Sequence, residues 1–267
     1  MNVDDMDAGR VKACCATSYS SDLVSMLLGD SYHPGGRRLT RRLLDALHVG
    51  PESRLVDVAC GIGTTSLLAA QEFGASVAGV DLSTANLALA AGSAAAAGIA
   101  DRVRFHHGDA ESLPLPDSAW DAVMCECALC TFPDKATAVT EMIRVLRPGG
   151  RVGISDITAE RDRLPTELTG MDAWVACVAD ARPAMEYEAL LVAHGLRITL
   201  VESHREALDR MVLQIAARVE LLRMTDQKRA TELGLDFERV PPVLTAAQDA
   251  IEAGTLGYTL IVAEKQP

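Results

Sequence analysis

Basic residues are scarce in this chain of 267 residues, which has 25 Lys and Arg against 37 Asp and Glu and a formal net charge of −12. Binding to nucleic acid depends on clustered Lys and Arg that neutralise phosphates, so this balance argues against a polyanionic partner. We expect a small-molecule substrate instead. The only basic cluster is Arg37, Arg38, Arg41 and Arg42, and its spacing is typical of one solvated helix face.

A membrane-spanning run and an export signal are also missing. No apolar run approaches the roughly 20 residues that a bilayer crossing needs. The first ten residues, MNVDDMDAGR, are acidic and polar, unlike a signal peptide. We therefore expect a cytoplasmic protein without a membrane partner, either a monomer or a homodimer. The odd number of cysteines, seven, fits reduced thiols better than a disulfide framework.

From residue 54 onward, short apolar runs alternate with helical patterns, which indicates βαβ units and a parallel sheet. The Ala- and Leu-rich stretch Leu87–Gly98 predicts a packed helix. Seven strands with helices between them predict a doubly wound sheet. The expected strands are Arg54–Val58, Ser76–Asp81, Val103–His107, Ala122–Cys125, Gly150–Asp156, Arg197–Ser203 and Tyr258–Glu264.

Three parts of the chain can be distinguished. Residues 1–50 are expected to form a helical cap that contributes to the site, residues 51–204 the core, and residues 205–267 a helical insert followed by the last strand. Within the cap we expect a helical segment over Val11–Leu28, a turn at His33–Gly36 and a helix from about Arg38 to Leu47. Within the insert we expect helices over Glu206–Met224 and Leu244–Ala253, with Pro241-Pro242 between them. The insert is expected to be a cap or an oligomer contact.

A glycine loop follows the first predicted strand, in the run Val56–Gly63 with the sequence VDVACGIG. Its glycines let the backbone approach a ligand, and the helix expected from about Thr64 offers free N–H groups. Asp81 ends the second strand about 20 residues later, where a carboxylate can accept hydrogen bonds from ribose hydroxyls. Asp109 follows the third strand, near where an adenine amine would lie. A dehydrogenase is disfavoured because Ser66 interrupts the G-x-G-x-x-G pattern.

In this order, over about residues 49–203, the motifs resemble the class I S-adenosylmethionine-dependent methyltransferases. The resemblance implies S-adenosylmethionine as cofactor and an α/β fold: a Rossmann-like, seven-stranded, mostly parallel sheet flanked by helices, with N-terminal helices and a helical insert near the C-terminus. Ala59 stands where many members have a glycine, which should crowd the loop slightly. Carried over residue by residue, the resemblance implies these cofactor contacts: Asp57, Ala59, Gly61, Gly63, Asp81, Leu82, Asp109, Ala110 and Glu126.

The cysteines gather where the acceptor would bind. Ligands in open α/β sheets lie outside the carboxyl ends of the strands, so at least one thiol of the run 125–135, CECALCTFPDK, should reach the pocket. Together with Ser155-Asp156-Ile157 and the run 174–181, WVACVADA, this segment resembles the arsenite methyltransferases. The resemblance implies a metalloid substrate and thiols that restore trivalent arsenic, such as glutathione or thioredoxin. It also implies catalytic arsenic ligands at Cys127, at Cys177 and at either Cys14 or Cys15, of which Cys15 is our candidate.

The chemistry of these ligands is consistent on its own terms. Soft thiolates prefer soft centres, and three of them can hold As(III) as a pyramid with its lone pair free. No general base is required for such an acceptor, and the protein's main task is positioning. Sb(III), Se or Hg would suit the same ligands. Cys60 and Cys125 are expected to be buried thiols, whereas Cys130 is open to either interpretation.

Three alternatives remain. A methyltransferase for an organic O, N or C nucleophile would need a base, for which the candidates are His33, His106, His107 and Glu126. A zinc site is disfavoured because the paired C-x₂-C spacing of structural zinc modules is missing. A non-enzymatic metalloid-binding protein has no evident need of an intact cofactor motif set, and the sequence has no basic recognition helix for DNA.

Overall fold

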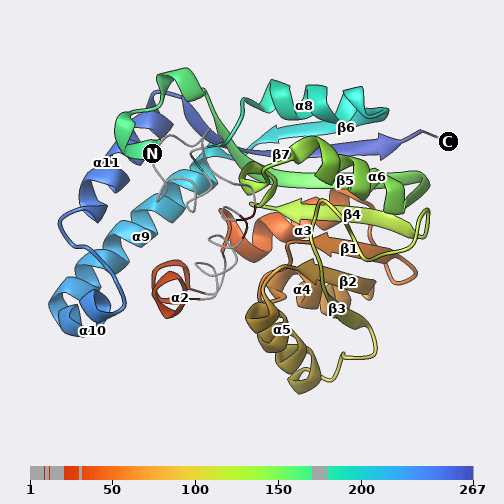
Figure 1. The fold of residues 1–267 in the computed structure, drawn as a ribbon, viewed down its shortest axis with the longest axis horizontal. Coiled ribbons are helices and arrows are strands. Elements are labelled where there is room, and N and C mark those ends of the chain that lie inside the picture. Colours follow the sequence, from red (N-terminus) through yellow and green to blue (C-terminus); the bar gives the residue numbers. More distant parts are fainter. Residues whose placement is uncertain are drawn as a thin grey trace.

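The computed structural model describes residues 9, 12, 21–29, 32–169, 178 and 180–266. Their strands form one seven-stranded sheet in the order β3-β2-β1-β4-β5-β7-β6 (Figure 1). Only β7 runs antiparallel to its neighbours. This confirms the predicted α/β class with a mostly parallel sheet. The strands are β1 (Arg54–Val58), β2 (Ser76–Asp81), β3 (Val103–His107), β4 (Trp120–Glu126), β5 (Leu146–Ala159), β6 (Leu196–Ser203) and β7 (Leu256–Lys265).

The first three strands have the predicted bounds, and the other four are longer than predicted. The difference is largest in β5, which begins at Leu146 and contains a bulge where Gly150 was expected to begin the strand. Trp120 pairs with Leu146 and Ala122 with Arg151, so a step of two residues along β4 matches five along β5. Extra residues in one strand of a pair bend it locally without ending it. Pro148, Gly149 and Gly150 thus lie within β5, at the bulge, and the strand begins before them.

The helices begin where the sequence provides caps. The side chains of Ser21, Ser83 and Asp134 each accept a hydrogen bond from a backbone N–H in the first turn of the helix that follows. The helices are α2 (Asp22–Leu28), α3 (Gly36–Ala46), α4 (Thr64–Phe73), α5 (Thr84–Ala96), α6 (Lys135–Val145), α8 (Ala184–Ala193), α9 (Arg205–Thr225), α10 (Gln227–Glu232) and α11 (Val240–Glu252), with short 3₁₀ turns η2 (Leu129–Thr131), η3 (Arg161–Arg163) and η4 (Thr166–Leu168).

Two expectations about helices need correction. The segment expected over Val11–Leu28 is not one helix, because Ser21 is extended and caps α2; most of residues 10–20 lies outside the described residues. Pro241 and Pro242 do not separate two helices but lie in the first turn of α11, where a proline loses no intrahelical hydrogen bond. The short helix α10 was not predicted.

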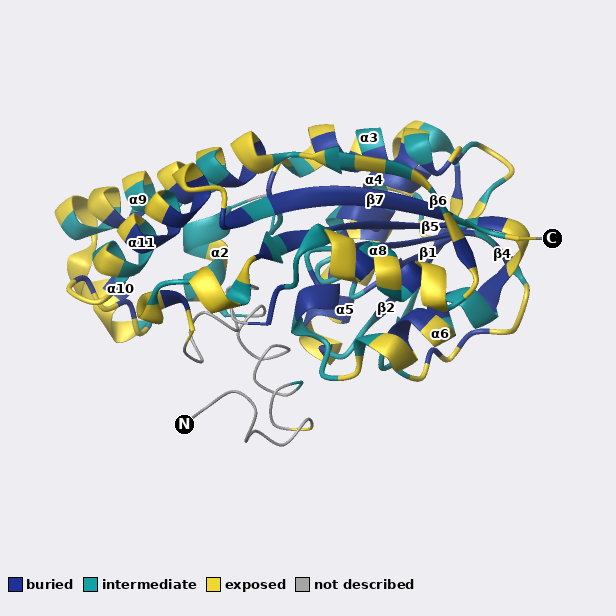
Figure 2. Ribbon diagram, turned by 90° about the horizontal axis from the view of Figure 1, so that it is seen from above, coloured by how far each residue is buried: buried dark blue, intermediate teal, exposed yellow. Residues whose placement is uncertain are grey.

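The sheet is covered on both faces, in three layers (Figure 2). Helices α3, α4, α9 and α11 pack on one face, where their buried residues join Leu55, Met124 and Tyr258. Helices α6 and α8 pack on the other face, against Val56 and Cys125. Neighbouring residues such as Leu55 and Val56 belong to opposite faces because side chains alternate along a strand.

The helical insert extends beyond the edge of the sheet. A separate cluster of Val219, Ala230, Leu235 and Phe237 joins α9, α10 and the chain that follows, and Leu23 and Leu27 of α2 pack against it. Figure 1 shows α9, α10 and α11 at one end of the molecule with α2 beside them. The insert therefore has a structural partner within the chain. Among the described residues, no helix is long and apolar enough to cross a membrane.

Candidate active site

The glycine loop between β1 and α4 makes a tight turn at the carboxyl end of the sheet. Ala59, Gly61 and Gly63 have φ values of 59°, 53° and 80°, in the left-handed region. No atom lies within 4 Å of the point that a Cβ on Gly61 would occupy, which leaves room for a ligand. A Cβ on Gly63 would lie 2.8 Å from Ala90 Cβ and 2.9 Å from Phe105 Cζ. The absence of a side chain at Gly63 therefore allows close packing against Ala90 and Phe105, and the ligand contact expected for Gly63 stays a prediction.

Asp81, at the end of β2, holds the glycine loop. Its carboxylate accepts hydrogen bonds from the backbone N–H of Gly61 and of Ser83, both at 2.8 Å. Burial raises the pKa of Asp81, and these two hydrogen bonds act against that rise. The side chain is thus fixed at the wall of the pocket, at the position predicted for a ribose contact.

Asp57, the fourth residue of β1, is a buried acid with one neutral partner. It is 2% exposed and accepts a hydrogen bond of 2.6 Å from Ser66 Oγ. Burial, together with the charges of Glu126 and Asp81, raises its pKa to about 7. Within the described ranges no cation pairs with it. Because an unpaired buried charge is costly, this carboxyl favours a cationic ligand group.

These side chains line a pocket of about 160 Å³. S-adenosylmethionine is a cation with an adenosine group, and a pocket walled by several acids with an open glycine turn fits such a molecule. The sulfonium would supply an electrophilic methyl group when bound. The sequence-predicted residues that line the pocket are Asp57, Ala59, Gly61, Asp81, Leu82, Asp109, Ala110, Glu126 and Cys127; Gly63 is not among them.

Lys12 closes the pocket on the side of Asp109. Its Nζ lies 2.7 Å from the Asp109 carboxylate and 2.5 Å from that of Glu111, and its side chain is 20% exposed. Burial lowers the pKa of Lys12, but the hydrogen bonds and charges of the two acids outweigh it and leave the pKa raised. Nothing in the sequence around Lys12 marks it as a pocket residue, and sequence reasoning missed it.

Glu126, at the end of β4, is enclosed by hydroxyl groups. Its side chain is 5% exposed and accepts hydrogen bonds from Thr65 at 2.7 Å, Thr40 at 3.1 Å and Ser155 at 3.3 Å. Tyr258 completes the network, because its buried hydroxyl donates to Ser155 Oγ at 3.0 Å. Three neutral donors satisfy the carboxylate without cancelling its charge. The roles of Thr40 and Thr65 had no sequence signal, because a lone threonine in a helical pattern is unremarkable.

His33 is the histidine that faces this carboxylate. Its Nε2 lies 3.6 Å from Glu126 Oε2 and 3.2 Å from Thr40 Oγ1, and its side chain is 11% exposed. Both His33 and Glu126 line the pocket, whereas His106 and His107 do not. Of the histidines considered as bases, the structure thus brings only His33 to Glu126 within the described residues.

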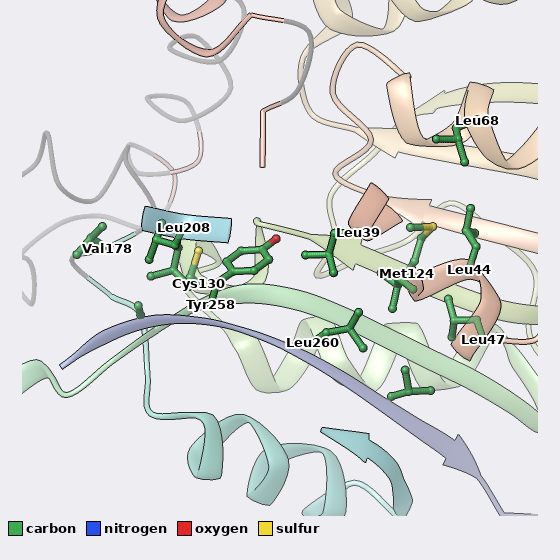
Figure 3. Close-up of a cluster of buried hydrophobic side chains, with 14 of the residues drawn as sticks. Leu39, Leu44, Leu47, Leu68, Met124, Cys130, Val178, Leu208, Tyr258 and Leu260 are labelled. Atoms are coloured by element: carbon green, nitrogen blue, oxygen red, sulfur yellow. The ribbon is translucent and has the colours of Figure 1, made fainter. Parts of the chain in front are cut away.

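The three thiols at the end of β4 and after it, those of Cys125, Cys127 and Cys130, lie in different surroundings. Cys127 lines the pocket, has φ 53° and donates its backbone N–H to Ser155 O at 2.7 Å. Cys125 is fully buried, and burial with the charge of Asp156 raises its thiol pKa well above the ordinary value. Cys130 is 1% exposed and lies in the hydrophobic cluster with Tyr258 and Leu208 (Figure 3). Cys125 and Cys130 are therefore core residues.

Cys60 lines the pocket but packs tightly. Its Sγ lies 2.9 Å from the point that a Cβ on Gly79 would occupy, and burial raises its thiol pKa. This agrees with the close-packed role expected for it. Of the predicted arsenic ligands, Cys14, Cys15 and Cys177 lie outside the described residues. Within the described part, no three His, Cys, Asp or Glu side chains are arranged to hold a metal ion.

A larger cleft, of about 700 Å³, lies between α3, α9 and the ends of β5, β6 and β7. None of the predicted site residues lines it. Arg38 and Arg42 do, and Arg42 pairs with Glu202 at 2.5 Å. Arg37 and Arg41 pair instead with Glu72 outside the cleft. The side chains of Arg37, Arg41 and Arg42 are 41–53% exposed, as expected for a solvated helix face.

Comparison with known proteins agrees with this geometry. A family profile described as a methyltransferase domain matches residues 55–150. The methyltransferase GfsG of Streptomyces halstedii is 36% identical over 170 residues, 62% of this chain and 61% of that protein. The 27-O-demethylrifamycin SV methyltransferase of Amycolatopsis mediterranei is 29% identical over 266 residues, 92% of this chain and 93% of that protein.

Two further likenesses differ in how much of the chain they cover. The arsenite methyltransferase of Halobacterium salinarum is 30% identical over 163 residues, which are 60% of this chain but only 41% of that protein. The crystal structure of the [4+2]-cyclase SpnF has a TM-score of 0.75 at 25% identity, over 98% of this chain and 97% of that one. The sheet order and the acid-lined glycine loop agree with the methyltransferase domain matched over residues 55–150, and together they support a class I S-adenosylmethionine-dependent methyltransferase.

Proposed function

We propose that the protein transfers the methyl group of S-adenosylmethionine to a soft trivalent centre, most simply arsenite, held by the thiolate of Cys127. The observation that carries the proposal is the backbone of Cys127. A left-handed conformation costs a residue with a side chain about 1–2 kcal/mol, and such strain gathers at functional sites. Here it places a thiol in the wall of the pocket that Asp57 and Asp81 also line.

The reaction needs little from the protein except alignment. The arsenic lone pair would attack the methyl carbon, an As–C bond would form as the C–S⁺ bond breaks, and S-adenosylhomocysteine would leave. Cys127 would lose its proton to solvent on binding arsenic, as thiol ligands do. A thiol such as glutathione or thioredoxin would then supply the electrons that return the methylated arsenic to the trivalent state. The likeness to an arsenite methyltransferase over 163 residues supports this choice of acceptor.

The test is a methylation assay with S-adenosylmethionine, arsenite and excess glutathione, with arsenic species separated and counted. We expect Cys127→Ser to lower the rate at least 100-fold while the Kd for S-adenosylmethionine stays within twofold. The core variants Cys125→Ala and Cys130→Ala serve as matched controls and should keep the rate. Single variants of Cys14, Cys15 and Cys177 then test the other predicted ligands. Equal activity of Cys127→Ser and the wild type would refute the proposal.

A second candidate function rests on the contact between His33 and Glu126. Both side chains are nearly buried in the pocket wall, with Nε2 3.6 Å from Oε2. A carboxylate that orients an imidazole is a common arrangement for a general base, which an O-methyltransferase requires. The likeness to a 27-O-demethylrifamycin SV methyltransferase over most of the chain supports this alternative.

His33→Asn separates the two candidates. If the acceptor is an organic hydroxyl, the variant should lose methyl transfer to that acceptor by the 10²- to 10⁴-fold typical of an acid-base group, an order-of-magnitude expectation. Methylation of arsenite should change little, because arsenic carries no proton to remove. 27-O-demethylrifamycin SV is a practical first probe. Turnover of this probe that does not depend on His33 would contradict the base assignment.

A further inference from the structure

Asp180 is the centre of an ion cluster in which its pair with Lys135 is nearly buried. Its carboxylate pairs with Lys135 Nζ, and it lies 3.2 Å from an Arg161 nitrogen and 3.3 Å from an Arg182 nitrogen. The side chains of Lys135 and Asp180 are only 11% and 10% exposed. These two residues belong to the two sequence runs that resembled the arsenite methyltransferases, CECALCTFPDK and WVACVADA.

Such a pair is not explained by stability alone. Removing two charges from water is costly, and an apolar pair of the same volume often stabilises a fold at least as well. A buried ion pair holds its two side chains in one geometry, because separating them would leave each charge buried without a partner. The position of this pair therefore matters more than its strength.

One end of the pair is anchored to the sheet. Arg182, two residues after Asp180, accepts a hydrogen bond through its backbone oxygen from Ala159 N at 3.1 Å, at the end of β5. Its own backbone N–H donates to the hydroxyl of the fully buried Tyr187 at 3.2 Å. Asp180 thus stands next to a segment that is fixed to β5 and to α8.

The other end holds the loop between β4 and α6. Lys135 Nζ also donates to Phe132 O at 3.0 Å. Phe132, Thr131, Ala128 and Cys127 all line the pocket. Lys135 therefore connects the fixed carboxylate of Asp180 to the loop that carries the acceptor side of the pocket wall.

We infer that Lys135 and Asp180 are positioning residues for the acceptor: their ion pair fixes the loop 127–134, and with it the thiol of Cys127, relative to the bound cofactor. This inference rests on the proposed role of Cys127, which it deepens. Neither residue lines the pocket, so neither is expected to contact the cofactor. Their loss should misplace the thiol and leave the cofactor end intact.

The experiment compares Asp180→Asn, Lys135→Gln and the conservative Lys135→Arg in the full-length protein. Glu264→Gln is the matched control, because Glu264 also pairs with two arginines, Arg151 and Arg197, both at 3.4 Å, and does not line the pocket. Three quantities are measured: the Kd for S-adenosylmethionine by calorimetry, kcat and KM for arsenite, and the rate at which iodoacetamide alkylates Cys127, located by peptide mass spectrometry.

We expect Asp180→Asn and Lys135→Gln to lower kcat/KM for arsenite 10- to 100-fold and to raise the alkylation rate of Cys127 at least threefold. The Kd for S-adenosylmethionine should change less than twofold, and Lys135→Arg should restore most of the wild-type behaviour. If Asp180→Asn does not fold, the two Lys135 variants decide the same question.

Two other results are informative. If the wild type methylates no arsenite but the alkylation rate responds as expected, the acceptor assignment fails and the positioning role stands. If every variant loses only thermal stability, as Glu264→Gln is expected to, and alkylation of Cys127 is unchanged, the inference is overturned.

Discussion

The two ends of the pocket are built in different ways. At the cofactor end, Asp57, Gly61 and Asp81 lie within about one βαβ unit, and the longest hydrogen bond joining them spans 20 positions. At the acceptor end, Glu126 is held by Thr40 and Thr65, which are 86 and 61 positions away in the chain. The glycine-loop part of the cofactor end is thus a local motif, whereas the acceptor end exists only once the whole domain has folded.

At the cofactor end, the raised pKa of Asp57 predicts that folding stability and cofactor affinity change in opposite directions with pH. Its pKa is raised to about 7 from a model-peptide value of 3.8, so the folded protein binds the proton more tightly than the unfolded chain does. The resulting stability is fully present below about pH 4 and is lost as the pH rises to about 7, by at most about 4 kcal/mol. Urea unfolding at several pH values should show this slope in the wild type. Asp57→Asn, which cannot titrate, should flatten it; an identical slope would contradict the assignment.

The same proton should oppose cofactor binding. A cationic cofactor favours the ionised carboxyl, so the Kd for S-adenosylmethionine should rise by up to about tenfold for each unit of pH below 7 and level off above it. Below pH 7, binding should release a proton, which calorimetry in two buffers of different ionisation enthalpy detects. A Kd independent of pH from 5 to 8 would mean that Asp57 does not face the cation.

Removing the charge at Asp57 tests the cofactor end directly. Asp57→Asn keeps an acceptor for Ser66 but loses the charge, and a hydrogen bond to a charged group contributes about 1.5–3 kcal/mol. We therefore expect the Kd for S-adenosylmethionine to rise about 10- to 100-fold at pH 8. Asp45→Asn, on the exposed face of α3, is the control and should bind as the wild type does. Equal affinity in both variants would place the methionine side of the cofactor elsewhere.

The two neighbouring thiols of the acceptor end should separate stability from activity. Cys125→Ser puts a more polar hydroxyl at a fully buried position of the core and should cost about 1–3 kcal/mol of unfolding free energy. Cys127→Ser, at the pocket wall, should cost under about 0.5 kcal/mol. Methyl transfer to arsenite should show the reverse order. Similar stability losses in both variants, measured by urea unfolding, would mean that Cys127 is also a core residue.

The sequence predicted the glycine loop of the cofactor end better than it predicted the acceptor end. The alternation of apolar runs located β1, β2 and β3 to the residue, and the glycine turn with Asp57 and Asp81 predicted the cofactor end, because these signals are local. Spacing alone cannot distinguish a glycine that only faces a ligand from one that packs against Phe105, as Gly63 does. The hydroxyl groups around Glu126 and the contact of Lys12 with Asp109 depend on long-range packing, which no local pattern encodes.

The smallest expected effect concerns the one residue of the cofactor end that departs from the family pattern. Ala59 has φ 59°, a backbone conformation that costs a residue with a side chain about 1–2 kcal/mol. A glycine avoids this cost, but its larger loss of conformational entropy on folding costs about 0.5–1 kcal/mol more than that of alanine. The difference leaves Ala59→Gly more stable than the wild type by up to about 1 kcal/mol. Ala95→Gly, exposed within α5, should instead lose about 1 kcal/mol. Urea unfolding of both variants measures whether each substitution raises or lowers the free energy of unfolding. If both substitutions lower it, the loop stores no strain at Ala59.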